Sequence, residues 1–272
     1  MKPSFVELSR PLIVGSVRQR TSNAAIAEVS AEESDSAKAF ILHLQLMDDG
    51  ERNFTNFKRI ADSTNYPIMA LNYRTDGGSD DKECLEVQRD AVRAGFKSVD
   101  IPVYIYDYDT QSSLSMCKLP FASANPKEVS MRPEVVDKQK ALIKEFHDIG
   151  AEVLMSAHVG VELSCEQAVS LALEIQSRGA DIVKIISFCE SKEQQLEILR
   201  TNLVLKNILN VPFLYTCSGT YNRFIRFSAP LFGSMLVFGH HEYGELSNKE
   251  KPLISDLAKF YEIITRGDLN VM

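Results

Sequence analysis

The sequence has no Cys-x-x-Cys pair, no long apolar run and no surplus of basic residues. Its five cysteines are odd in number and scattered, and its five histidines are scattered too, apart from the adjacent His240 and His241. A disulfide framework or a metal site is therefore not expected, and reduced thiols in a cytoplasmic protein are the simplest interpretation. No stretch approaches the roughly 18 to 20 apolar residues that span a bilayer, and the first residues lack the apolar core of a signal peptide.

The charge balance narrows the classes of ligand. The chain has 272 residues with 30 basic and 37 acidic side chains, which gives a net charge of −7 at pH 7. Proteins that bind nucleic acids or anionic membranes usually have a basic surplus, so neither partner is expected. A small anionic substrate is still compatible with this charge, because one or two local arginines decide its binding.

Short apolar runs alternate with longer amphipathic stretches along the chain, and the runs are apolar on both faces, as in a covered parallel sheet. The expected strands are 11–17, 40–46, 67–73, 98–106, 152–158, 181–187, 212–217 and 234–239. The expected helices are 22–34, 54–64, 80–94, 133–148, 164–178, 190–206, 222–231 and 253–266. Eight strands, each followed by a helix, predict an α/β protein with one domain over residues 1–272, a (β/α)8 TIM barrel. A doubly wound open sheet is the alternative.

Residues 107–131 interrupt this alternation. The segment is rich in Ser, Pro, Asn and Asp, has no sustained periodicity and follows the fourth expected strand. Loops at that end of barrel strands surround the active site, and a loop of this length is either functional or disordered. An active-site loop and a mobile surface insertion are therefore both open.

Two residues on consecutive strands suggest chemistry. Lys184 interrupts an apolar strand, and a buried lysine can supply a neutral amine that attacks a carbonyl. His158 closes the preceding strand, where an imidazole can transfer protons at neutral pH. Each residue alone also has a structural interpretation, a lysine that extends to the strand end or a hydrogen-bonded histidine. Their position on neighbouring strands favours the catalytic interpretation of both.

With these residues the chain resembles the type I 3-dehydroquinase family. The segment MSAH, which ends at His158, is similar to the family strand that ends in Ser-x-His, and residues 181–184 are similar to its Asp-Ile-x-Lys strand. The segment GTYNRFIR, which ends at Arg226, and the LFGS after it resemble the family's Gly-to-Arg stretch and its Phe-Gly-Ser. Arg74 matches the family's strand-three arginine, and Asp100 ends a match to its strand-four Val-Asp. The resemblance spans nearly the whole chain.

The resemblance implies a Schiff-base dehydratase that converts 3-dehydroquinate to 3-dehydroshikimate without a metal or another cofactor. Lys184 would condense with the ketone of this cyclic keto acid. His158 would remove the proton beside the imine and return one to the departing hydroxyl. Arg226 and Arg74 would hold the substrate carboxylate, which an arginine fork matches in two hydrogen bonds. The family resemblance also suggests a homodimer.

Several positions depart from the family's pattern. His43 and Gln45 stand where the family's second strand has a Glu-x-Arg pair, and the acid after the strand-three arginine is Asp76, in a shorter loop. We expect these three residues to bind the substrate. His43 is either a replacement that orients or transfers protons, or a strand histidine satisfied by the backbone. The family's late Ser-Ala-Pro-Gly-Gln lid is replaced by residues 239–252, in which Ser247 and His241 are the candidate substitutes.

Three hypotheses for function follow from this pattern. The first is a divergent 3-dehydroquinate dehydratase. The second is a Schiff-base lyase of the same fold that acts on a different keto acid, because the changed positions are those that bind the substrate hydroxyls. The third is a ligand-binding or regulatory relative without catalysis, against which the presence of both Lys184 and His158 counts.

Overall fold

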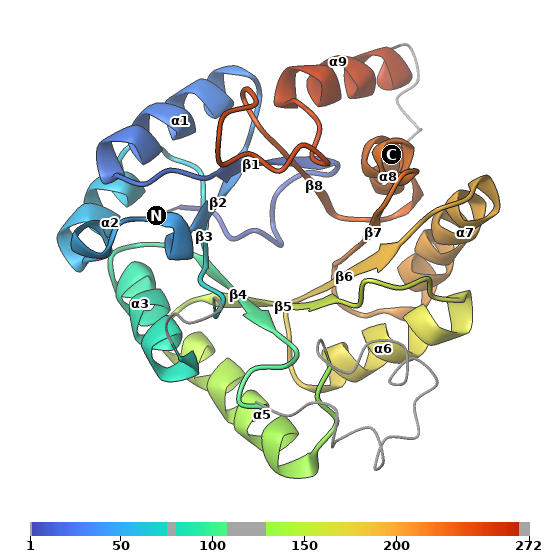
Figure 1. Ribbon diagram of the computed structural model, residues 1–272, viewed down its shortest axis with the longest axis horizontal. Helices are drawn as coiled ribbons and strands as arrows, with labels where there is room; N and C mark the ends of the chain where they lie inside the picture. The colour runs from blue at the N-terminus through green and yellow to red at the C-terminus, as the bar shows by residue number, and fades with distance from the viewer. Residues whose placement is uncertain (1, 75–79, 108–128, 267–272) are drawn as a thin grey trace. The chain divides into compact units, whose positions relative to one another are not determined.

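The computed structural model describes residues 2–74, 80–107 and 129–266 (Figure 1). The chain divides into two compact units, each made of strands and the helices that follow them. Unit 1 comprises Met1–Asp100, Ile149–Glu152 and Leu236–Met272, and unit 2 comprises Ile101–Asp148 and Val153–Met235. The single domain expected from the sequence stays a prediction.

Unit 1 contains neighbouring parallel strands. In the order in which they pair, they are β8 (Leu236–Gly239), β1 (Leu12–Val17), β2 (Ala39–His43), β3 (Ile68–Leu71) and β4 (Ser98–Pro102), of which residues 98–100 belong to this unit. All residues of β1, β2 and β3 are buried, because helices cover the strands as they do in parallel sheets generally. The first and last strands of the chain are neighbours, which is the strand order of a barrel.

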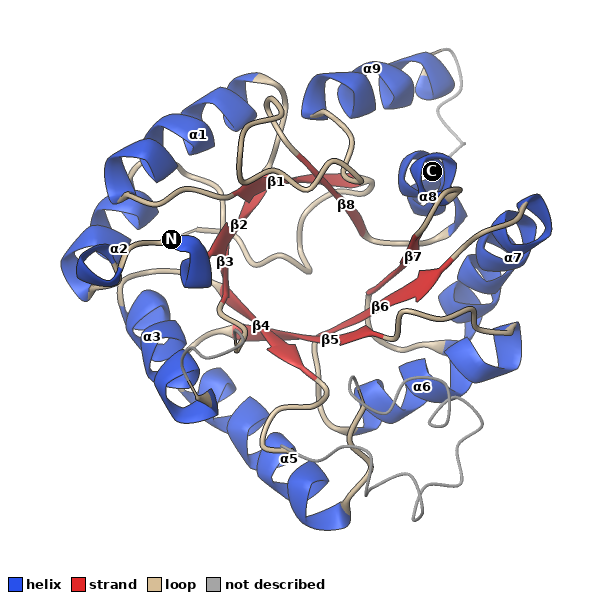
Figure 2. Cartoon of the chain, viewed as in Figure 1, coloured by secondary structure: helices blue, strands red, loops and turns tan. Residues whose placement is uncertain are grey.

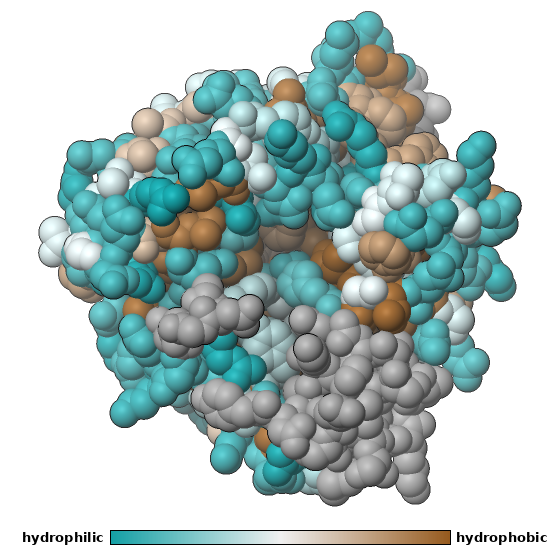
Figure 3. Space-filling model, in the orientation of Figure 1, coloured by the Kyte–Doolittle hydropathy of each residue, from teal (hydrophilic) through white to brown (hydrophobic). Residues whose placement is uncertain are grey.

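Helices flank the strands of unit 1 (Figure 2). Those in its described residues are α1 (Ser22–Ser34), α2 (Phe54–Asp62), α3 (Asp81–Arg93) and α9 (Ile254–Thr265), with short 3-10 helices η1 (Leu44–Leu46) and η2 (Asp49–Glu51). Thr21, Asn53 and Asp80 cap the first three of these helices, since each side chain accepts a hydrogen bond from a backbone N–H of the first turn. Figure 3 shows apolar side chains on α9, where Ile263 is 57% exposed.

Unit 2 contains three strands that pair in parallel and in chain order, β5 (Glu152–His158), β6 (Ile182–Phe188) and β7 (Phe213–Ser218). Its described helices are α5 (Pro133–Asp148), α6 (Cys165–Ser177), α7 (Lys192–Ile208) and α8 (Asn222–Ser228), with the 3-10 helix η4 (Ala229–Phe232). Ser164 and Ser191 begin α6 and α7 with a capping box, in which the cap side chain and a glutamine three residues later exchange hydrogen bonds with backbone N–H groups.

The eight expected strands are confirmed, and together with the helices they give the (β/α)8 order. Three strands end earlier than expected, and one of them is the strand 67–73, which ends at Leu71. The strand 40–46 ends at His43 because its partner β3 ends at Leu71, the residue in register with His43. The strand 98–106 ends at Pro102, which has no N–H to donate to a ladder, and a turn follows with a 3.0 Å hydrogen bond from Ile105 N to Pro102 O.

The expected helix 222–231 is also shorter than predicted. Its α-helical part ends at Ser228, and η4 continues the chain as a 3-10 helix that contains Pro230. Proline lacks the N–H that an α-helix needs at an interior position, which accounts for the change.

Most of the expected insertion 107–131 lies outside the described residues. Asp107 and Ser130, near its two ends, are both buried, and the Ser130 hydroxyl donates a 2.5 Å hydrogen bond to the Asp107 carboxylate. Within the described part of the chain, no helix combines the length and apolar character that crossing a bilayer requires.

A buried arginine joins three segments of unit 2. Arg178 follows α6 and is only 2% exposed. Its guanidinium donates hydrogen bonds to Gln139 Oε1 at 2.5 Å and to Ser130 O at 2.8 Å, and it lies 3.0 Å from Glu174 Oε1. The buried charge is therefore both paired and hydrogen-bonded, as burial of an ion requires.

We expect Arg178→Met to lower the free energy of unfolding by about 3 kcal/mol, because it leaves the buried amide and carbonyl oxygens without their donor. Urea unfolding measures the change. Arg200→Met is the matched control, since Arg200 is 74% exposed and lies 3.7 Å from Glu197, and it should cost less than about 0.5 kcal/mol. Equal losses in the two variants would contradict the role given to Arg178.

Candidate active site

Lys184 lies within β6 and is buried, with 5% of its surface exposed. In the parallel pair of β5 and β6, Ser156 is in register with Lys184, and His158 is in register with Ile186. Register partners and every second residue of a strand share a face. Lys184, Ser156 and His158 therefore lie on one face of the two strands, with His158 nearer to the carboxyl end. The structure brings the two predicted catalytic residues to the same side of adjacent strands.

β7 extends this face with a threonine. Thr216 is in register with Ile186 and therefore lies on the same face as Lys184. The residue is 3% exposed, and its hydroxyl oxygen has no hydrogen-bond partner among the residues that the structure describes. An unpaired buried hydroxyl costs free energy. Sequence reasoning did not identify Thr216, because threonine is common in strands and its spacing gave no other signal.

The opposite face of β6 and β7 carries different polar groups. Ser187 Oγ lies 3.4 Å from the phenol oxygen of Tyr215, and both residues are fully buried. Burial raises the pKa of Tyr215 well above its usual value, so its phenol stays protonated at any physiological pH. Along β6 and β7, Ser187 and Tyr215 stand at positions that alternate with those of Lys184 and Thr216. Their side chains therefore face away from Lys184.

The loop after β7 is held against the loop after β6. Gly219 has φ +99°, and a Cβ atom there would lie 2.7 Å from the carbonyl oxygen of Cys189, so the turn requires glycine. The Glu190 carboxylate accepts hydrogen bonds from the Thr220 N–H at 2.9 Å and from its hydroxyl at 2.8 Å. These bonds lower the pKa of Glu190. The start of α8 is thereby fixed relative to β6.

Arg226 projects from α8, the helix that follows this loop, and is 7% exposed. Its Nε donates a 3.2 Å hydrogen bond to Asn222 Oδ1, one helical turn earlier. The Asn222 amide in turn donates to the Gly219 carbonyl oxygen. The orientation of the guanidinium is therefore tied to the same loop that anchors α8.

Two further predicted positions lie after β3 in unit 1. Arg74 Nε lies 3.1 Å from Asp81 Oδ1, and the Asp81 side chain is 2% exposed. The neighbouring Tyr73 hydroxyl donates a 2.7 Å hydrogen bond to Asp100, which is fully buried on β4. Asp76 lies outside the described residues.

His43 is part of a polar cluster at the ends of β1 and β2. Its Nε2 lies 3.2 Å from Ser16 Oγ, and its Nδ1 lies 3.2 Å from an Arg18 terminal nitrogen. Lys251, from the segment after β8, donates a 2.6 Å hydrogen bond to Ser16 Oγ. His43 is therefore bonded to side chains. Sequence reasoning missed Ser16, Arg18 and Lys251, because nothing in their local pattern connects three distant segments.

The other residues expected near this cluster are placed differently. Gln45 lies on η1 after the strand, and its buried amide oxygen has no hydrogen-bond partner in the described part of the chain. His241 pairs with Asp35 at 2.7 Å, and Ser247 Oγ accepts a hydrogen bond from Gly244 N at 2.9 Å. Two residues of the segment that replaces the family's lid are bonded to the His43 cluster, Lys251 through Ser16 and the Leu246 carbonyl oxygen through Arg18 Nε.

Comparison with known proteins identifies relatives of this arrangement. The model of the type I 3-dehydroquinase family matches residues 16–268. The 3-dehydroquinate dehydratase from Geobacillus kaustophilus has a TM-score of 0.74 and 15% identity, over 97% of this chain and 94% of that chain. The type I enzyme from Clostridium difficile, solved with covalently modified comenic acid, has a TM-score of 0.72 and 16% identity, over 95% and 94% of the two chains.

A third similar structure is the 3-dehydroquinate dehydratase from Enterococcus faecalis, with a TM-score of 0.67 and 18% identity over 95% of each chain. No curated protein matches the chain in sequence. The likeness to these solved structures shows the fold, which is the (β/α)8 barrel expected from the sequence.

Thr216→Val tests whether the Thr216 hydroxyl, on the same face of the strands as Lys184, is unpaired. We expect the free energy of unfolding to stay the same or to rise by up to about 1 kcal/mol, since valine removes an unsatisfied buried oxygen without changing the shape. Thr201→Val is the control, because the buried Thr201 hydroxyl donates a 2.7 Å hydrogen bond to Glu197 O. The control should lose about 1 kcal/mol. A similar loss in Thr216→Val, measured by urea unfolding, would show that this hydroxyl is bonded.

Proposed function

The chain belongs to the type I 3-dehydroquinase family, and we propose that it is a dehydratase that converts 3-dehydroquinate to 3-dehydroshikimate, a reaction of the shikimate pathway. The observation that supports this most directly is the placement of Lys184 and His158 on the same face of neighbouring strands. An amine and an imidazole side by side are the two groups that an imine-based elimination needs.

The reaction begins when the Lys184 amine adds to the ketone carbon and water leaves, which forms a protonated imine. The positive nitrogen withdraws electrons and acidifies the adjacent C–H. His158 takes that proton and then gives a proton to the departing hydroxyl, so that one water is eliminated. Hydrolysis of the imine releases the product and restores the amine. Lys184 is only 5% exposed, so an imine formed on it is shielded from bulk water during these steps.

The substrate carboxylate is assigned to Arg226 and Arg74. The planar guanidinium of arginine matches a carboxylate in two parallel hydrogen bonds, which orients the ring for attack. For Arg226 this assignment is supported by its fixed orientation, since Asn222 holds Nε. Arg74 is held by the buried Asp81, and Asp76 follows it in the sequence as a further substrate contact.

A second candidate function is a Schiff-base lyase of the same fold that acts on another keto acid. The His43 cluster favours this alternative, because Arg18 and Lys251 bring two cationic groups to a region where the family has one acid and one arginine. Together with Gln45, such a cluster selects hydroxyl or carboxylate groups that differ from those of 3-dehydroquinate. The homodimer suggested by the family resemblance stays a prediction.

Borohydride trapping tests the mechanism. Full-length protein incubated with 3-dehydroquinate and borohydride should give a reduced adduct on Lys184, detected by peptide mass spectrometry, and the adduct mass should show loss of water. Lys184→Ala should give no adduct and no dehydratase activity. His158→Ala should still form the adduct but slow turnover by at least about 100-fold, since general acid–base catalysis contributes 10²–10⁴-fold.

Lys144→Ala is the control, because Lys144 is 74% exposed and its loss should change neither adduct nor rate. An adduct that retains the water would favour the alternative substrate. Full activity in Lys184→Ala would overturn the imine mechanism, and the absence of an adduct with any keto acid would favour a relative that binds without catalysis.

A further inference from the structure

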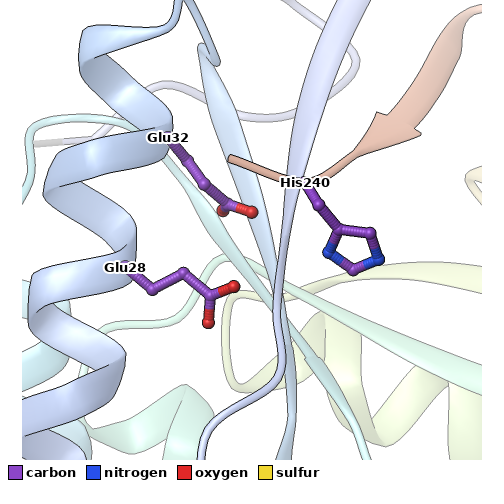
Figure 4. A group of neighbouring side chains, drawn as sticks. All are labelled: Glu28, Glu32 and His240. Atoms are coloured by element: carbon purple, nitrogen blue, oxygen red, sulfur yellow. The ribbon is translucent and has the colours of Figure 1, made fainter. Parts of the chain in front are cut away.

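Two glutamates of α1 and one histidine after β8 come together in unit 1. Glu28 and Glu32 are four residues apart and therefore lie on the same side of the helix. One carboxylate oxygen of each and one ring nitrogen of His240 all lie within 4.8 Å of one another. Figure 4 shows both glutamates directed from α1 toward β1, and the His240 ring at the other edge of the β1 ribbon in this view.

The strand β1 is shaped to admit one of these carboxylates. A Cβ atom on Gly15 would lie only 2.1 Å from Glu32 Oε2, so the carboxylate occupies the space that glycine leaves open. Two backbone N–H groups of this segment orient the acids. Ser16 N donates to Glu32 Oε1 at 3.0 Å, and Arg18 N donates to Glu28 Oε2 at 3.0 Å. The second oxygen of Glu32 has no hydrogen-bond partner in the described part of the chain.

His240 is fully buried, and neither ring nitrogen makes a hydrogen bond to a described residue. The backbone carbonyl groups of Ser16 and Asn248 lie near the ring but outside hydrogen-bonding geometry. Buried polar groups are satisfied in most proteins, so an orphaned imidazole needs an explanation.

The two carboxylates also lack a cationic partner among the residues that the structure describes. Burial raises the pKa of both, and the proximity of Glu28 raises that of Glu32 further. Neither makes an ion pair with the residues that the structure describes. The nearby cations are directed elsewhere, since Lys251 Nζ donates to Ser16 Oγ at 2.6 Å and an Arg18 terminal nitrogen lies 3.2 Å from His43 Nδ1. Buried acids in such a position are usually paired or coordinate a metal.

We propose that Glu28, Glu32 and His240 form a binding site for a divalent first-row transition metal ion such as Zn²⁺. Imidazole together with carboxylate oxygens suits these metals, whereas Mg²⁺ and Ca²⁺ prefer oxygen ligands alone. Ligands at 2.0–2.2 Å from one zinc ion in tetrahedral geometry are about 3.4 Å apart. Atoms within 4.8 Å of one another reach that spacing through small side-chain movements.

A metal at this position joins α1 to the end of β8. It supplies the positive charge that the two acids lack and a partner for the imidazole and for the open oxygen of Glu32. The alternative occupant of this space is a proton shared between the two carboxyl groups. A metal ion and a shared proton would each offset the negative charge of the two carboxylates. Only the metal ion would also give the His240 imidazole a partner.

The test uses the full-length protein stripped of metal with a chelator. Calorimetric titration should show one Zn²⁺ bound per chain, Co²⁺ should give the visible absorption bands of a low-coordinate site, and Zn²⁺ should raise the melting temperature. Glu32→Gln keeps the oxygen that accepts from Ser16 N and removes the charge. We expect Glu32→Gln and His240→Gln each to weaken binding at least 100-fold.

His241→Gln is the matched control, because this neighbouring side chain is 42% exposed and pairs with Asp35. It should leave the Co²⁺ spectrum and the affinity unchanged. Loss of binding in His241→Gln but not in His240→Gln would assign the metal to the surface and overturn the proposal. The proposal would equally fall if the wild-type chain bound no metal while Glu32→Gln stabilised it, which indicates a shared proton. These measurements are independent of dehydratase activity.

Discussion

The register of the parallel ladder from β5 to β7 decides which side chains of unit 2 can act together. Ser156 is opposite Lys184, and Ile186 is opposite both His158 and Thr216. Side chains alternate between faces along a strand, so a slip of one residue would turn Lys184 toward the helices. The backbone hydrogen bonds of the sheet therefore fix the relative positions of Lys184 and His158, independently of any side-chain contact.

The loops that follow the strands depend on this frame. Gly219 adopts a left-handed conformation that brings the chain against the carbonyl of Cys189, and Glu190 holds Thr220 by two hydrogen bonds. Because α8 starts from this anchored loop, the position of Arg226 follows from contacts between two consecutive loops. A rigid scaffold that places loop residues is the general arrangement in barrel enzymes.

In unit 1, β1 contributes to two polar clusters. The hydroxyl of Ser16 contacts His43 and Lys251, while the N–H of the same residue binds Glu32. The missing side chain of Gly15 leaves room for the Glu32 carboxylate. Ser16 therefore takes part in both clusters, in one through its hydroxyl and in the other through its N–H.

The sequence by itself determined the alternation of eight strands and helices, because apolar periodicity and helix caps are local signals. It also suggested Lys184 and His158 as catalytic candidates, since each interrupts or ends an apolar strand, and Arg226 as a substrate-binding candidate through a recognisable segment. The strand ends predicted at residues 46 and 106 were wrong, because a strand stops where its partner stops, as at His43, or where a donor is missing, as at Pro102.

Only the tertiary structure decided which distant groups meet. Nothing in the local sequence connects Lys251 with Ser16, or His240 with Glu28 and Glu32, because these residues lie on different elements and their neighbours along the chain are ordinary. Their scattered positions were the reason that a metal site was not expected. Periodicity and caps are properties of a few consecutive residues, whereas a buried polar cluster forms only when strands pair and a helix packs on them.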